Sequence, residues 1–274
     1  MNNPFPQAIR SIRFWLLLAF LSCIFPQNSS ADPVIVRTSQ GTVHGYLEMR
    51  SQDGHVVATG DSVQVAHGDR VTTHTVFNYK DGSVDDETTV FSQHHSFQLI
   101  TYHHIQKGPA FPHPVDLAID ARSGQVTVRS TGKDGKQVVK TDHVGMPPDL
   151  GNGMVPLILA NVRSDAAQTT IPILVTTPKP RLVKLLITRS GEDTFSIGDS
   201  SHKAVHYEIR IEIGGIAGVI APLVGKAPPN LQIWLVGGEA PTFLREQGSL
   251  CEDCPVMTIQ LASPVWPGSG KPGS

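Results

Sequence analysis

The sequence predicts a mostly β protein, built as a single antiparallel meander sheet with two short apolar helices packed on it. Three observations carry this prediction. Short segments alternate apolar and polar residues along most of the chain, which is the period of a half-buried strand. Turn sequences separate these segments, and the chain holds 25 glycines and 21 prolines to form them. Strands do not alternate regularly with helices, which argues against a parallel α/β fold.

The clearest strand lies between Ala204 and Ile213. Its odd positions are all apolar and its even positions, His206 to Glu212, are polar or charged, so one face packs on a core. The segment that follows, Ile216–Gly225, carries no charge, and its apolar residues recur at helical spacing. Because Pro222 removes a helical hydrogen bond, we expect about two turns of helix there. This helix is expected to plug the sheet, or alternatively to form a lid over an apolar ligand or a loop that dips into a membrane.

Turn chemistry separates the other expected strands. Asp81-Gly82 predicts a tight hairpin after the strand Val71–Tyr79, and Asp134-Gly135 predicts a second one. A turn at Ser190–Asp193 is expected to separate the strands 182–188 and 194–197, and a strand at 231–236 includes Trp234.

The first helix is predicted in the middle of the chain. Asn152 is expected to cap a helix over Gly153–Arg163, with Pro156 tolerated near its first turn. The segment is apolar nearly all round, so it should be buried against the sheet.

The N-terminus has the order of a secretory signal peptide. Arg10 and Arg13 precede the apolar run Phe14–Phe25, and small residues lead to Ala31. We therefore expect residues 1–31 to be removed on export to the periplasm or the exterior, leaving a β domain over 32–266 and a disordered tail over 267–274. Cys23 has the place of a lipoprotein cysteine, but the residues before it suit lipidation poorly.

Charge and hydropathy narrow the expected partners. The formal net charge is −2 and the 22 basic residues do not cluster, so neither nucleic acid nor an anionic membrane surface is a favoured partner. No second apolar run is long enough to span a bilayer, so no transmembrane span is expected in the mature chain.

Three stretches resemble a family of exported bacterial proteins defined only as domain of unknown function 3108. They are Met146–Asp149 with the apolar segment to Arg163, Arg181–Thr188, and Pro229–Leu235 with the turn and strand that follow. The resemblance covers about two thirds of the mature chain. It implies an envelope-located antiparallel β domain with a strongly curved sheet, as an open or half barrel or a sandwich-like fold. It transfers no catalytic residue.

Two groups of residues have spacings that could support chemistry. Cys251 and Cys254 have the spacing of a redox pair or a zinc half-site, but acidic neighbours disfavour the thiolate and no second cysteine pair completes a zinc site. A small disulfide is the main expectation, with zinc or free thiols as alternatives. Among the 12 histidines, His104 and His113 are the pair that a metal would use. We assign no catalytic residue, metal ligand or cofactor.

These observations favour a binding protein over an enzyme, because the sequence holds no hydrolase elbow, dinucleotide fingerprint or phosphate-binding loop. The main hypothesis is a non-catalytic module for an apolar or lipid-like ligand. The alternatives are a structural or protein-interaction domain of the cell envelope with a filled core and, third, a metal-dependent enzyme. The residues predicted to line the ligand are Leu157, Ile158, Ile216, Val219, Ile220, Leu223 and Trp234.

Overall fold

The computed structural model describes residues 33–131, 136–176, 179–197, 200–212, 230–238, 240–251 and 253–262, all within one compact unit. Nearly all of its regular structure is β. Its strands are β1 (Val43–Arg50), β2 (Val56–His67), β3 (Arg70–Tyr79), β4 (Val84–Ser92), β5 (Gln98–Lys107), β6 (Val115–Asp120), β7 (Gln125–Thr131), β8 (Gln137–His143), β9 (Gln168–Val175), β10 (Arg181–Ile197), β11 (Ser200–Glu212), β12 (Leu231–Val236), β13 (Thr242–Ser249) and β14 (Val256–Leu261). The helix α2 spans Val155–Leu159.

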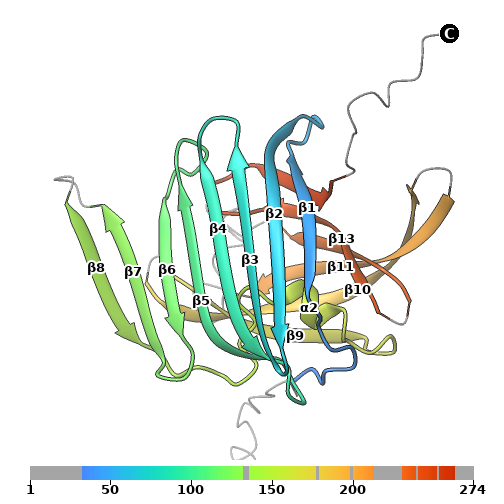
Figure 1. The fold of residues 1–274 in the computed structure, drawn as a ribbon, viewed down its shortest axis with the longest axis horizontal. Coiled ribbons are helices and arrows are strands. Elements are labelled where there is room, and N and C mark those ends of the chain that lie inside the picture. Colours follow the sequence, from blue (N-terminus) through green and yellow to red (C-terminus); the bar gives the residue numbers. More distant parts are fainter. Residues whose placement is uncertain are drawn as a thin grey trace, which may run out of the picture. The chain divides into compact units, whose positions relative to one another are not determined.

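The strands form one antiparallel sheet, which confirms the predicted meander (Figure 1). Its order is β8-β7-β6-β5-β4-β3-β2-β1-β14-β13-β12-β11-β10-β9. The first and last strands of the chain pair with each other in the middle of the sheet, from Leu47 opposite Leu261 to Arg50 opposite Thr258. The consecutive strands β8 and β9 are its two edges, so the sheet is open rather than closed into a barrel.

The Asp81-Gly82 hairpin and the alternating burial of β11 are both present as predicted. Tyr79 donates its backbone N–H to Ser83 across the Asp81-Gly82 turn, and Gly82 has a φ of 86° that favours glycine. In β11, Tyr207 and Ile209 are buried while Glu208 and Arg210 are exposed, as their alternation predicts.

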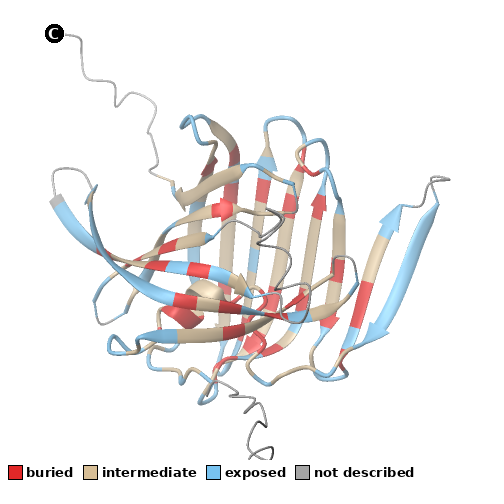
Figure 2. Ribbon diagram, turned by 180° about the vertical axis from the view of Figure 1, so that it is seen from behind, coloured by how far each residue is buried: buried red, intermediate tan, exposed pale blue. Residues whose placement is uncertain are grey.

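The sheet folds over so that its two halves share one hydrophobic core. This core joins buried side chains of β3 to β7, of α2 and the segment before it, and of β9 to β12. Strands β9 to β13 run across the inner face of the first half (Figure 2). A second, smaller cluster of Met49, Ala58 and Phe77 lies on the inner face of β1 to β3. The inner face therefore has two separate apolar regions.

One expected turn is absent. Residues 190–193 do not separate two strands, because β10 continues from Arg181 to Ile197 and pairs with β11 along its length. The pairing shifts between Arg189 and Gly191, where Gly191 has a φ of 147°. The turn-forming residues are thus accommodated by a β-bulge, which bends the strand without ending it.

The predicted helix is shorter than expected, and its expected cap is wrong. It covers five residues, and Met154 stands at the N-cap without a side-chain cap. Asn152 instead pairs with the backbone of β9, donating Nδ2 to the Leu174 carbonyl at 3.0 Å and accepting the Leu174 N–H at 2.8 Å. Gly153, with a φ of 70°, packs against Thr89 and turns the chain into the helix. Ile158 and Leu159 are buried, as predicted.

Several expectations lie outside the described residues: the signal peptide 1–31, the hairpin at Lys133–Gly135, the second helix over 216–224 and the tail 267–274. Where two helices were expected, the described part of the chain holds one. None of the helical structure described there is long and apolar enough to cross a bilayer.

Candidate binding site

A band of polar side chains crosses the inner face of the sheet between its two apolar regions. One row of directly opposed residues runs from Ser62 through Thr75 and Glu87 to His104. The neighbouring row on the same face runs from Gln64 through Thr73 and Thr89 to Tyr102. We call these residues, with Asp85, Gln106 and Glu246, the inner polar band. Core-facing strand positions are ordinarily apolar, so this band is the main exception in the inner face.

A buried hydrogen-bonded group anchors the band at β4 and β5. Asp85 accepts Gln106 Nε2 at 2.9 Å, and its other oxygen lies 2.8 Å from His104 Nε2. Burial disfavours the charged imidazole, but the hydrogen bond to Asp85 and the surrounding carboxylates outweigh it, so the pKa of His104 is raised. Gln106 Nε2 also reaches the Leu250 carbonyl at 3.3 Å, which ties β5 to the segment that follows β13.

Two carboxyl groups on strands that are not neighbours interact electrostatically. Glu87 on β4 accepts the Tyr102 hydroxyl at 2.7 Å, and burial raises the pKa of both groups. Burial raises the pKa of Glu246 on β13 to about 7, and the charge of Glu87 adds to this shift. Both glutamates are partly exposed. Within the described ranges, Glu246 has no hydrogen-bond partner or ion pair.

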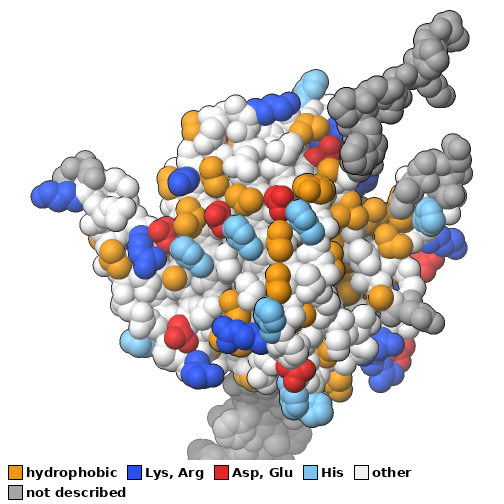
Figure 3. Space-filling view, viewed as in Figure 1, with side chains coloured by type: hydrophobic (Ala, Val, Ile, Leu, Met, Phe, Trp, Pro, Cys, Tyr) orange, Lys and Arg blue, Asp and Glu red, His pale blue; other side chains and the backbone are white. Residues whose placement is uncertain are grey.

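Histidine and aspartate side chains alternate on the outer face of the first seven strands (Figure 3). His44 lies 3.0 Å from Asp61, His74 lies 3.0 Å from Asp86, and His103 lies 3.1 Å from Asp116, which Arg129 also contacts. Each pair links two adjacent strands. Such exposed pairs contribute about 0–1 kcal/mol each. They give three of the 12 histidines an aspartate partner within the protein.

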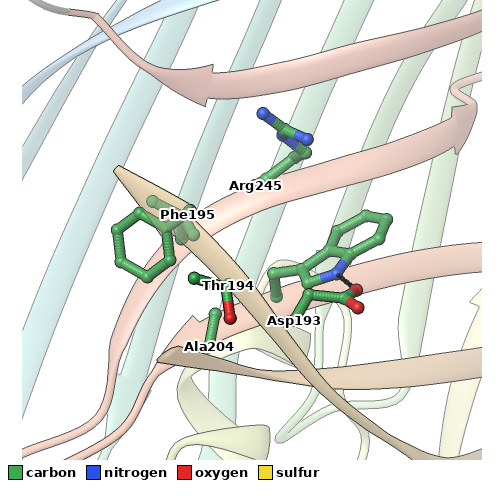
Figure 4. A pocket seen from close by; sticks show the side chains of 7 residues that line it. Asp193, Thr194, Phe195, Ala204 and Arg245 are labelled. Carbon is green, nitrogen blue, oxygen red and sulfur yellow. Dashed lines mark hydrogen bonds between the residues drawn. The ribbon is translucent and has the colours of Figure 1, made fainter. Parts of the chain in front are cut away.

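A separate pocket of about 300 Å³ lies on the outer face of the second half of the sheet (Figure 4). Trp234 Nε1 donates to Asp193 at 2.6 Å, which holds the bulged part of β10 over β12. The Trp234 ring stacks on His206 with 4.5 Å between centroids, and the Arg245 guanidinium lies 5.9 Å from its centroid. Phe195 closes another side of the pocket.

The residues predicted to line one apolar ligand are not all brought together among the described positions. Ile158 is buried in the main core and Leu157 is partly buried against it. Trp234 lines the outer pocket instead. Ile216, Val219, Ile220 and Leu223 lie outside the described residues.

The structure joins Cys251 and Cys254 in a disulfide. Ser249 Oγ lies 2.8 Å from the carbonyl oxygens of both cysteines and can donate to either of them, and Cys254 Sγ lies 3.8 Å from the Ala110 carbonyl. This short loop thus packs beside the connection between β5 and β6.

The two histidines that were considered for a metal have separate aspartate partners. His104 contacts Asp85, whereas His113 lies 3.2 Å from Asp253. Over the described ranges, no group of three or more histidine, cysteine or acidic residues is arranged to hold a metal ion.

Sequence reasoning missed the inner polar band, although one signal was present. In the strand Val84–Ser92, residues 85 to 89 are polar at every position, so neither face is apolar there. In the structure Asp85 is buried on the inner face, and Asp86 pairs with His74 on the outer face. Glu246 gave no local signal, because its neighbourhood depends on the folding of the whole sheet.

Fold and site together define an open, antiparallel β-meander protein with a polar band inside it. No family model and no curated protein matches the chain. Among solved structures, the chain is similar to a beta-barrel-like protein of domain of unknown function DUF1849 from Brucella abortus. The identity is 9%, the TM-score is 0.45, and the match covers 82% of this chain and 98% of that chain.

The resemblance to family 3108 is therefore wrong, because no family model matches the chain. The resemblance is based on short apolar sequence segments and on the order of the expected strands. Many antiparallel meanders share both features, so neither identifies a family.

Proposed function

We propose that this protein is a non-catalytic binding module for a lipid-like ligand whose head is cationic or uncharged rather than anionic. The single observation that carries the proposal is the inner polar band, with Glu246 lacking a partner in the described structure. A purely structural core would bury apolar side chains at these positions, because an uncompensated polar group inside a protein costs several kcal/mol.

The chemistry around the band supports an amphipathic ligand. Leu231 and Phe243 on β12 and β13 are partly buried apolar side chains on the margin of the main core. They offer apolar surface near Glu246, which follows Phe243 on the same strand. A hydrocarbon chain would pack there, and an ammonium or hydroxyl head would donate to the carboxylates of Glu87 and Glu246. An anionic head would be repelled by both.

We further propose that the protein acts outside the cytoplasm. The basic, apolar and small-residue order of the first 31 residues supports export. The disulfide between Cys251 and Cys254 is consistent with an oxidising compartment.

Binding of three matched amphiphiles tests the proposal. Purified, delipidated protein would be loaded at pH 8 with the neutral dye Nile red, and dodecylamine, dodecanol and dodecanoate would compete for it. We expect dodecanoate to displace the dye at least about tenfold more weakly than dodecylamine, a difference of about 1.4 kcal/mol. The double variant Glu87→Gln/Glu246→Gln should reduce that difference to about threefold or less, because it removes the charges that discriminate.

Glu212→Gln is the control, since Glu212 is an exposed glutamate on the outer side of β11. It should leave the ranking unchanged. Equal displacement by all three amphiphiles would overturn the proposed head-group chemistry, and failure to take up the dye would overturn binding itself.

A structural or interaction domain with a filled interior is the second candidate. The continuous core around α2 favours it, because Ile158, Leu159 and their neighbours fill the space between the two halves of the sheet there. This alternative predicts no dye uptake.

A further inference from the structure

The two edges of the sheet differ in how their backbone is protected. At β9, Pro172 lacks an N–H and its carbonyl accepts the Gly151 N–H at 2.8 Å. Asn152 occupies the Leu174 N–H and carbonyl two residues further along. The edge of β9 is therefore closed to another strand, as edges of natural sheets usually are.

The opposite edge, β8, has no such cover among the described residues. All seven of its residues are exposed, including Val138 at 37% and Val139 at 57%, and the strand stands at the rim of the sheet (Figure 2). It pairs with β7 on one side, from Gln125 opposite His143 to Thr131 opposite Gln137. Its other side presents unpaired backbone groups, which are a template for a further strand.

The charges of β8 are self-complementary. Lys140 and Asp142 flank Thr141 and share the face on which Val126 and Val128 lie, since they oppose these two residues in β7. Within the described part of the chain, neither Lys140 nor Asp142 forms a salt bridge. Antiparallel pairing with a second β8 about Thr141 would place each Lys140 opposite Asp142 of the partner subunit. Pairing about Lys140 or about Asp142 would instead oppose like charges, which destabilises a sheet.

We propose that β8 is a homodimerisation edge, at which two copies of this chain pair antiparallel about Thr141 to form one continuous sheet. Two-fold symmetry brings the same strand of each copy together, so every favourable pair occurs twice. The contact is smaller than a standard protein interface, so we expect a dissociation constant between about 10 µM and about 1 mM.

Charge reversal tests the register. Sedimentation velocity over a concentration series would measure the dimer of the wild type, of Lys140→Glu, of Asp142→Lys and of the double variant. We expect each single variant to weaken association at least about fivefold, and the double variant to restore it to within about twofold, because it exchanges the two charges. Circular dichroism melts would show that all four proteins remain folded.

Cysteine trapping tests the axis of symmetry. Thr141→Cys places two cysteines directly opposite each other, whereas in the matched Val139→Cys variant each cysteine faces His143 of the partner subunit. Under mild oxidation we expect Thr141→Cys to cross-link at least about tenfold faster, because a disulfide requires closely spaced Cα atoms.

Equal cross-linking rates for Thr141→Cys and Val139→Cys would overturn the proposal, as would a double charge variant that associates no better than the single ones. Capture of an extended peptide by β8 without self-association would also overturn it, since the edge would then serve a different partner. Selective trapping at Thr141 together with rescue by the double variant would support it.

Discussion

Replacing Glu246 with glutamine is expected to raise the free energy of unfolding at pH 8 by up to about 3 kcal/mol. Below about pH 4 the same substitution should have little effect on stability. The folded protein raises the pKa of this carboxyl from 4.5 to about 7. The folded state therefore holds the proton more tightly than the unfolded chain does, and the carboxyl opposes folding once it must ionise. In the wild type this lowers stability as the pH rises from about 4.5 to about 7, above which the loss is complete.

Urea unfolding of wild type and Glu246→Gln between pH 4 and 8.5 measures this effect. The charge of Glu87 acts on Glu246, and the pKa of Glu87 is itself raised by burial, so the difference between the two proteins is the informative quantity. Glu212→Gln should change stability by less than about 0.5 kcal/mol at every pH. A Glu246→Gln protein that is no more stable than the wild type at pH 8 would contradict the raised pKa of this carboxyl.

Replacing Asn152 with alanine is expected to destabilise the protein by about 2–6 kcal/mol. The amide of Asn152 is buried and makes both a donor and an acceptor bond to the backbone of Leu174. Alanine would leave the N–H and carbonyl of Leu174 without partners in a buried place, and each unsatisfied group costs about 1–3 kcal/mol.

Thermal and urea unfolding of Asn152→Ala beside Asn78→Ala measures the loss. Asn78 is an exposed asparagine in β3, so its replacement should cost less than about 0.5 kcal/mol. Equal stability of the two variants would mean that Asn152 does not protect the edge of β9.

Much of the sheet could be predicted from the sequence, because alternation of apolar and polar residues is a local signal. The buried Tyr207 and Ile209 of β11 and the hairpin at Asp81-Gly82 follow directly from residue type and spacing. The burial of Ile158 and Leu159 could also be predicted, because they lie in a segment that is apolar nearly all round.

The features that the sequence did not predict have a common physical cause. In each of them, a distant part of the chain supplies the interaction that determines the local structure. Ser190–Asp193 has turn composition, but pairing with β11 carries the strand through it. Asn152 precedes a helix, but the backbone of β9 competes for its amide. The candidate site needs Glu87 and Glu246, which lie on strands separated by most of the chain. The local sequence indicates the unusual polarity of β4. It does not reveal that the carboxyl of Glu246, on a distant strand, interacts with Glu87.

The junction of β1 with β14 gives the sheet an order of assembly. On either side of this junction, every strand pairs with its neighbour in the chain, so each half can form hairpin by hairpin. The junction itself joins the beginning of the domain to its end, and loop closure over that length makes it the slowest contact to form. Until β14 has paired with β1, each half exposes the unpaired backbone of its inner edge strand, and the folding protein is then most open to mispairing.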